Sequence, residues 1–267
     1  MVTEAELPVD TELMVHRNAD DTFTGRSSVP RDRVFGGMLL GQALRAAQLT
    51  VERERHPHSL QASFLRAPDG RLPLHYAVEE TRSGGSFSAR RVVARQSDDI
   101  VFTMTAGFQA EEDGLAYAAA PTEGVVGPEG LDRGRYSTPW FESRDVPRAG
   151  GGFPMHARRA WFRARLPLPD DRHVHAQALA YMSDHGPTRA IRQPFEGHPG
   201  LDRRRSVTLQ HSVWFRAPVR IDGWLLSEFW PVSTGGGRGV ASGTIRDADG
   251  TLLATVTQEA LLRVPDA

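Results

Sequence analysis

The chain has 267 residues, of which 39% are hydrophobic and 24% are charged, values typical of a globular protein and not of a disordered one. The formal net charge of −1 leaves no overall positive field that would draw the protein onto nucleic acid. No stretch approaches the ~18 consecutive apolar residues of a membrane helix, and the acidic N-terminus lacks the features of a secretory signal peptide. The sequence therefore predicts a cytoplasmic protein with no nucleic-acid partner and no membrane insertion.

Two residue types are absent, and their absence restricts the available chemistry. The chain has no cysteine, which excludes disulfides, thiolate metal sites and a cysteine nucleophile. All 32 residues counted as Lys or Arg are arginine, which excludes Schiff-base lysines. Histidines with two-residue spacing at 56–58 and 173–175 lack an HExxH pattern, so we expect no metal site. Acid–base chemistry by Asp, Glu or His and hydroxyl nucleophiles remain.

The first half of the chain predicts one helix followed by four strands. Residues 37–53 contain no proline and begin apolar around the whole circumference, which is typical of a helix buried on all sides. Strand-like runs follow, separated by turn residues such as Asp69-Gly70. The predicted strands cover residues 58–67, 72–82, 86–96 and 100–110.

The second half repeats this order after a stretch without periodicity. Residues 111–140 are rich in Gly, Ala, Pro and Glu, and we interpret them as a linker. The predicted domains are therefore residues 1–110 and residues 141–267. A strand at 157–165 and a helix at about 173–184 are expected in the second domain. They precede four further strands, at residues 207–218, 221–233, 238–247 and 251–263.

Short sequence matches indicate that the second half is a copy of the first. Residues 64–68 (FLRAP) match residues 214–218 (WFRAP) at a spacing of 150 residues. Upstream, residues 42–44 (QAL) match residues 177–179 (QAL) at a spacing of 135 residues. Further matches follow in the same order at nearly constant spacing, which indicates a tandem duplication.

One helix followed by antiparallel strands, twice over, predicts an α+β architecture. A helix that is apolar all round needs a sheet wrapped around it. Two such sheets can join edge to edge, which hides exposed strand edges. The sequence therefore predicts a double hot-dog fold, in which two tandem hot-dog domains each have a long central helix wrapped by an antiparallel sheet.

Six motifs in order resemble the acyl-CoA thioesterase II family, over roughly residues 22–263. In the first half they are Val34-Phe35-Gly36-Gly37 followed by Gly41-Gln42-Ala43-Leu44, and GSFSARRV at residues 85–92. In the second half they are YMSD at residues 181–184, HSVWF at 211–215, Arg238-Gly239 and TQE at 257–259. Two positions depart from the family pattern: Gln210 replaces an acidic residue of close relatives, and Met38 replaces a Gln of some relatives.

This resemblance implies hydrolysis of fatty acyl-CoA to free fatty acid and CoA, without a metal or cofactor. The family's catalytic Asp, Thr and Gln fall on Asp184, Thr208 and Gln258. We expect Asp184 to be the general base for a water molecule that Thr208 and Gln258 hold in place. Because hot-dog proteins usually associate through sheet edges, we also expect a homo-oligomer.

Other residues are candidates for binding the substrate. Backbone N–H groups near Gly36 and Gly37 could stabilise the oxyanion. Arg238, in a glycine-rich hairpin, and the run of residues 203–205 (RRR) could contact phosphates of CoA. By the repeat spacing, the three catalytic positions correspond in the first half to Leu49, His58 and Gly107, so the polar set exists only in the second half.

Alternative interpretations remain open at this stage. Asp184 could be only a helix-end carboxylate, Gln258 could only satisfy neighbouring backbone groups, and the arginines could lie in solvated loops. The protein could be a hydratase or dehydratase of acyl thioesters that uses Asp184 and His185, although adjacent helical residues point apart. It could also be a non-catalytic acyl-CoA binding module. A serine hydrolase is disfavoured because residues 84–88 (GGSFS) lack the final glycine of the Gly-x-Ser-x-Gly elbow.

Overall fold

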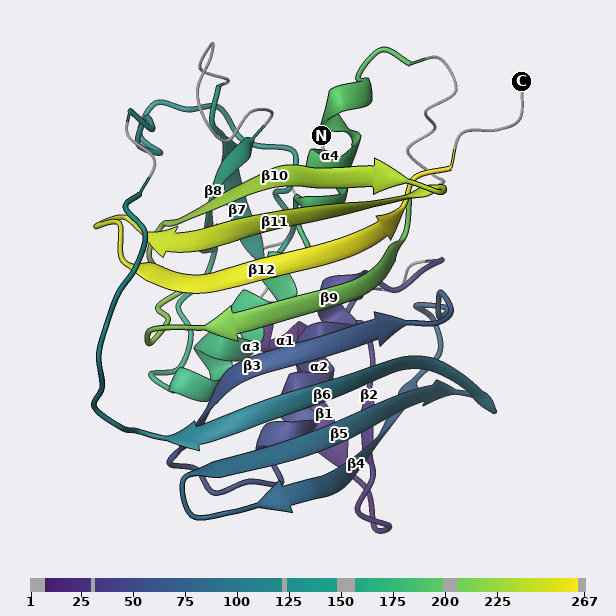
Figure 1. Cartoon of the computed structure of the whole chain (residues 1–267). Coiled ribbons are helices and arrows are strands. Elements are labelled where there is room, and N and C mark those ends of the chain that lie inside the picture. The colour runs from purple at the N-terminus through teal and green to yellow at the C-terminus, as the bar shows by residue number, and fades with distance from the viewer. Residues whose placement is uncertain (1–7, 30–31, 122–123, 148–156, 199–205, 264–267) are drawn as a thin grey trace.

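A computed structural model describes residues 8–29, 32–121, 124–147, 157–198 and 206–263 (Figure 1). The first half contains α1 (Val9–Glu12), β1 (Val15–Arg17), β2 (Phe23–Gly25), α2 (Gly36–Gln48), β3 (Arg55–Phe64), β4 (Leu74–Ser83), β5 (Phe87–Gln96) and β6 (Asp99–Ala110). The second half contains β7 (Phe141–Asp145), β8 (Arg158–Ala164), α3 (Arg172–Ser183), α4 (Pro187–Arg192), a 3₁₀ turn at Gln193–Phe195, β9 (Thr208–Phe215), β10 (Leu225–Gly235), β11 (Arg238–Asp247) and β12 (Leu252–Leu261).

The strands of the described residues form one twelve-stranded sheet, in the order β1-β2-β4-β5-β6-β3-β9-β12-β11-β10-β8-β7. The order is symmetric about the β3–β9 junction. Each strand of the first half lies as many positions from the junction as the equivalent strand of the second half. At the junction Gln61 pairs with Ser212 and Ala62 with His211, in antiparallel register. Since the repeat spacing equates Gln61 with His211, the two halves are related by a local twofold axis there. The predicted double hot-dog fold is confirmed.

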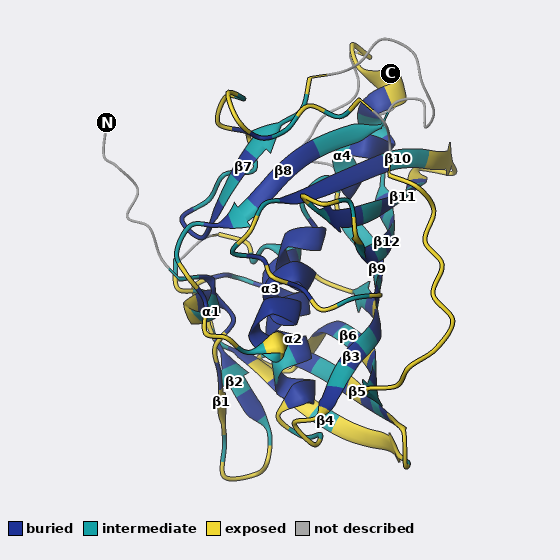
Figure 2. Cartoon of the chain, turned by 90° about the vertical axis from the view of Figure 1, so that its left-hand side faces the viewer, coloured by how far each residue is buried: buried dark blue, intermediate teal, exposed yellow. Residues whose placement is uncertain are grey.

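Helices α2 and α3 lie side by side on the inner face of this sheet (Figure 2). They run antiparallel, because Gly37 lies beside Tyr181 and Gly41 lies beside Gln177. A Cβ atom on Gly37 would overlap the carbonyl oxygen of Tyr181, so glycine is needed for this close approach. Every residue of α2 except Gly36 and Arg45 is buried, as its all-round apolar sequence predicts.

The predicted first helix is too long at its C-terminal end. Residues 37–53 were expected to be helical, but α2 ends at Gln48. The next residues turn the chain toward β3, and the Thr50 hydroxyl donates a 2.8 Å hydrogen bond to the Ala47 carbonyl oxygen. This side-chain bond competes with continuation of the helix. The following strand, expected from residue 58, consequently begins at Arg55.

Several short elements were not predicted from the sequence. Strands β1 and β2 have three residues each, too few to show a period, and they extend the sheet beyond β4. Helix α4 begins with Pro187 directly after Gly186, which adopts a positive φ of 116°. Among the described residues, no helix has the length and apolar character needed to cross a membrane.

The β3–β9 junction provides a test of how the two halves depend on each other. Leu60 and Val213 face each other across this junction, and both side chains are fully buried. We expect Leu60→Ala to lower the free energy of unfolding by about 2–5 kcal/mol, measured by chemical denaturation, because it leaves a cavity. The control Leu65→Ala changes a side chain that is 54% exposed and should shift stability by about 0.5 kcal/mol or less. Equal effects of the two variants would contradict this role of the junction.

Candidate active site

The C-terminal end of α3 meets the N-terminal end of α2, and Asp184 lies between them. Asp184 is the C-cap residue of α3 and is only 9% exposed. The backbone N–H of Gly37 hydrogen-bonds to its carboxylate. A Cβ atom on Gly36 would lie 2.5 Å from Asp184 Oδ2, so the carboxylate occupies the space that glycine leaves. The N-cap residue Phe35 provides no side-chain cap, so the start of α2 keeps backbone donors near the carboxylate.

The structure brings Asp184, Thr208 and Gln258 into one hydrogen-bonded group. The Thr208 hydroxyl, at the start of β9, donates to Asp184 Oδ1 at 3.2 Å. Gln258 Nε2, on β12, donates to the same hydroxyl at 3.1 Å. Its second amide proton points to Thr188 Oγ1 on α4, at 2.8 Å. The three residues that the sequence predicts therefore converge from α3, β9 and β12.

Sequence reasoning missed the residues that hold Gln258 from behind. His211 Nδ1 lies 2.7 Å from Gln258 Oε1, and His211 Nε2 lies 2.8 Å from the Ser183 hydroxyl. Because an amide oxygen only accepts, Nδ1 carries the proton and donates it to Gln258. His211 is fully buried, and its place in the HSVWF motif was the one available signal. The chain of hydrogen bonds thus runs in one direction, from His211 through Gln258 and Thr208 to Asp184.

Burial changes the protonation of both titratable groups in this network. It raises the pKa of Asp184 to about 7, although the bonds from Thr208 and Gly37 partly oppose the shift. It lowers the pKa of His211 to about 4, so this imidazole is neutral at physiological pH. A carboxyl group that titrates near neutrality is suited to accept a proton from water.

Asp184 lines a cavity of about 570 Å³, which is large enough for part of a small-molecule substrate. Phe35, Tyr136, Thr188 and the arginines of α4 also line it. The ring of the neighbouring His185 stacks on Phe35, with centroids 4.3 Å apart. Aromatic packing therefore orients His185 beside the cavity.

The remaining residues singled out in the sequence are placed as follows. Arg238, at the exposed start of β11, forms an ion pair with Glu259 at 3.1 Å and does not line this cavity. Residues 203–205 lie outside the described residues. Gln210 is exposed, whereas its neighbour His211 points into the core, so this departure from the family pattern lies on the outer face. Met38 is buried in α2.

The first half does not repeat the Asp-Thr-Gln set at the corresponding positions. Leu49 is the C-cap residue of α2, as Asp184 is of α3, and it is exposed. His58 lies against Gly107, where a Cβ atom would overlap the imidazole. In addition, the N-cap Asp171 accepts a hydrogen bond from the backbone of His173, which satisfies a donor at the start of α3. Asp184 and the uncapped N-terminus of α2 thus occur together at one end of the α2–α3 pair.

Within the described ranges, no group of three or more His, Asp or Glu side chains is arranged to hold a metal ion.

Comparisons with known proteins identify the family of this chain. Residues 25–109 match the acyl-CoA thioesterase N-terminal domain, and residues 114–262 match the acyl-CoA thioesterase C-terminal domain. Acyl-coenzyme A thioesterase 8 of Homo sapiens is 33% identical, over 96% of this chain and 89% of the relative. Acyl-CoA thioesterase 2 of Haemophilus influenzae is 32% identical, over 94% of this chain and 95% of the relative.

A solved structure, the acyl-CoA thioesterase II TesB2 from Mycobacterium marinum, is 34% identical with a TM-score of 0.86. The alignment covers 97% of this chain and 98% of that chain. The similarity thus includes both halves and the segments that carry the site. The chain belongs to the acyl-CoA thioesterase family of double hot-dog proteins and is an acyl-CoA thioester hydrolase.

Proposed function

We propose that the enzyme hydrolyses fatty acyl-CoA at Asp184, which acts as the general base for a water molecule. The buried position of Asp184 carries this proposal, because burial raises its pKa to about 7 in a cavity that can admit a substrate. A base with this pKa is largely ionised at slightly alkaline pH and still accepts a proton readily. The Thr208 hydroxyl lies beside it and orients the water, and the Gln258 amide fixes the position of that hydroxyl.

The proposed reaction is the hydrolysis of the thioester by this water molecule. The water oxygen forms a bond to the carbonyl carbon while Asp184 takes one water proton. The resulting tetrahedral intermediate carries its negative charge on the former carbonyl oxygen. When the carbon–sulfur bond breaks, Asp184 returns the proton to the departing sulfur. The products are the free acid and CoA, and the carboxylate is regenerated.

The start of α2 is the proposed site for the oxyanion. The start of this helix has no side-chain cap, its N-cap residue Phe35 lines the cavity, and the helix dipole adds a partial positive charge there. Preorganised donors of this kind stabilise the transition state without rearranging during the reaction.

We further propose that the protein is a homo-oligomer. The sheet of the described residues ends at β1 on one side and β7 on the other. β7 also forms an isolated bridge between Arg144 and Arg133, whereas β1 pairs only with β2. The unpaired edge of β1 favours association with a second copy. The cytoplasmic location expected from the sequence stays a prediction.

Replacing the proposed base should abolish turnover. We expect Asp184→Asn to lower kcat at least about 100-fold, because asparagine cannot take the water proton. Release of free CoA, followed with a thiol reagent over short, medium and long acyl-CoA substrates, measures this directly. The cysteine-free enzyme contributes no thiol background.

The stability of this variant serves as its control. A carboxyl group whose pKa is raised in the folded state stabilises the protein fully below its unfolded pKa, and this contribution is lost as pH rises through about 7. At pH 8, therefore, Asp184→Asn should be at least as stable as the wild type. Near wild-type turnover by a folded Asp184→Asn enzyme would refute the proposed base.

The pH dependence should identify the same carboxyl group. Wild-type kcat/KM should rise with pH and level off above an apparent pKa of about 7, since only ionised Asp184 is active. Thr208→Val removes a hydrogen bond that lowers the pKa of Asp184, so the rising limb should move to higher pH. Thr257→Val, on the same strand as Gln258 but bonded to Ser242, should leave the profile unchanged. A Thr208→Val profile identical to that of the wild type would count against this assignment.

The space at the start of α2 can be tested with a single methyl group. In Gly36→Ala the new Cβ would lie 2.5 Å from Asp184 Oδ2, which displaces the carboxylate. We expect kcat to fall by about 10- to 100-fold, as a displacement of about 1 Å can cause. Gly85→Ala is the matched control, because nothing lies within 4 Å of its new Cβ. Unchanged kcat in Gly36→Ala would show that the carboxylate does not need this position.

A further inference from the structure

A second cavity adjoins the cavity at Asp184. This inner cavity, of about 240 Å³, shares Tyr136, Arg189 and three other lining residues with the first. It extends between α4 and strands β8 and β10, where Ala160, Ser227 and Phe229 line it. Tyr136 and Arg189 therefore lie at the boundary that the two cavities share.

Tyr136 brings an unused polar group to this boundary. Its hydroxyl oxygen is buried and has no hydrogen-bond partner in the part of the chain that the structure describes. Burial raises the pKa of Tyr136, so the side chain stays a phenol and keeps its proton to donate. A buried hydroxyl without a partner costs stability, which favours a partner supplied by a bound molecule.

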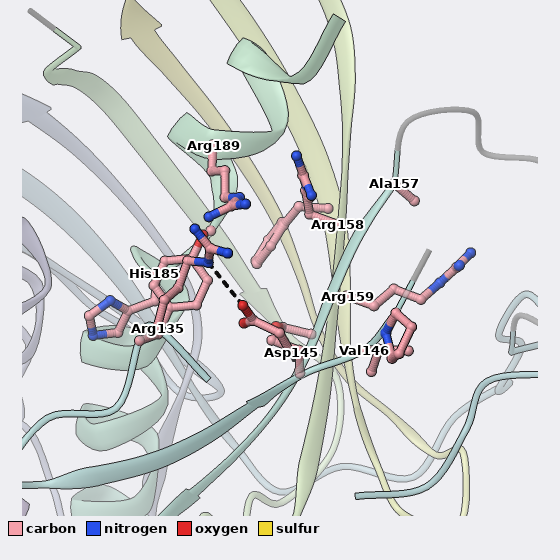
Figure 3. Close-up of a pocket in the computed structure, with 14 residues that line it drawn as sticks. Arg135, Asp145, Val146, Ala157, Arg158, Arg159, His185 and Arg189 are labelled. Atoms are coloured by element: carbon pink, nitrogen blue, oxygen red, sulfur yellow. Dashed lines mark hydrogen bonds and ion pairs between the residues drawn. The ribbon is translucent and has the colours of Figure 1, made fainter. Parts of the chain in front are cut away.

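Arg189 brings an uncompensated positive charge to the same place. The other arginines of the inner cavity have acidic partners: Arg135 pairs with Asp145, Arg158 with Glu196, and Arg159 with Glu228. By contrast, the half-buried guanidinium of Arg189 forms no hydrogen bond or ion pair with any residue in the described ranges. Figure 3 shows it reaching from α4 toward Arg135 and His185, into the lined space.

Tyr136, with its unpartnered hydroxyl, and Arg189 line one cavity together with Asp184, and the geometry points to a subsite for an anionic oxygen group of the substrate. This group is either a carboxylate carried by the acyl chain or a phosphate of CoA, since both accept hydrogen bonds from a phenol and a guanidinium. The assignment rests on the proposed function in so far as Asp184 marks the position of the thioester. It makes Tyr136 and Arg189 specificity residues of the known reaction.

Paired substrates and matched variants test this subsite. The substrates are hexanoyl-CoA and adipoyl-CoA, which differ by a terminal carboxylate, and the longer pair octanoyl-CoA and suberoyl-CoA. The variants are Arg189→Met and Tyr136→Phe, with Arg189→Lys to restore the charge. Arg91→Met and Tyr117→Phe change exposed residues elsewhere and serve as controls.

Two results would support the subsite and identify its ligand. If it binds an acyl carboxylate, Arg189→Met lowers kcat/KM for the carboxylated substrates at least about tenfold and leaves the unsubstituted substrates nearly unchanged. If it binds a phosphate, Arg189→Met raises KM about equally for all four substrates and weakens inhibition by free CoA by the same factor. In either case Tyr136→Phe gives a smaller change in the same direction, and Arg189→Lys partly restores the wild-type values.

The subsite is overturned if Arg189→Met and Tyr136→Phe behave like the two control variants on every substrate and in inhibition by CoA. Failure of the proposed base is recognised separately, by an Asp184→Asn enzyme that still turns over. Calorimetric binding of adipoyl-CoA and of CoA to Asp184→Asn, with and without Arg189→Met, measures the subsite without turnover. Equal affinities in these two backgrounds would likewise exclude it.

Discussion

The close antiparallel packing of α2 against α3 is the constraint on which the rest of this structure depends. Glycines at positions 37 and 41 let the two helix backbones approach, and a side chain at Gly37 would overlap the carbonyl oxygen of Tyr181. Because the helices run antiparallel, the C-cap of α3 reaches the N-terminus of α2. Asp184 is thereby removed from water and placed among backbone donors. The sheet then has to wrap around both helices, which the edge-to-edge junction of β3 and β9 achieves.

The local twofold axis would permit two equivalent sites, and the cap residues differ between the two ends of the helix pair. At one end the cap of α3 is Asp184, and the uncapped start of α2 faces it. At the other end the cap of α2 is the exposed Leu49, and Asp171 already accepts a bond from the start of α3. The second end thus has no carboxylate at the helix C-cap, and one backbone N–H group at the start of α3 is already bonded to Asp171. The duplication accounts for the shared backbone arrangement of the two halves, and the two ends of the helix pair differ only in a few side chains.

The repeat made most of the fold predictable, because each strand pattern was seen twice and supported its copy. Boundaries set by single side chains were not predictable: the helix of residues 37–53 ends at Gln48, where no proline or glycine marks the end. At the site, the motifs identified Asp184, Thr208 and Gln258, which the structure joins by hydrogen bonds. His211 and Thr188 were missed as partners because their contacts join segments that are distant in sequence. Such contacts depend on strand register and helix placement, which sequence periodicity does not encode.

Helix α4 joins the proposed catalytic group to the proposed subsite through two adjacent residues. Thr188 accepts a hydrogen bond from Gln258, and Arg189 lines both cavities. Gln258 in turn donates to Thr208, which donates to Asp184, so the position of α4 is coupled to the group around the proposed base. Because α4 carries both residues, a substrate group bound at Arg189 would act on the same helix that positions Gln258. Proposed charge recognition and proposed proton transfer thus depend on the placement of one short helix.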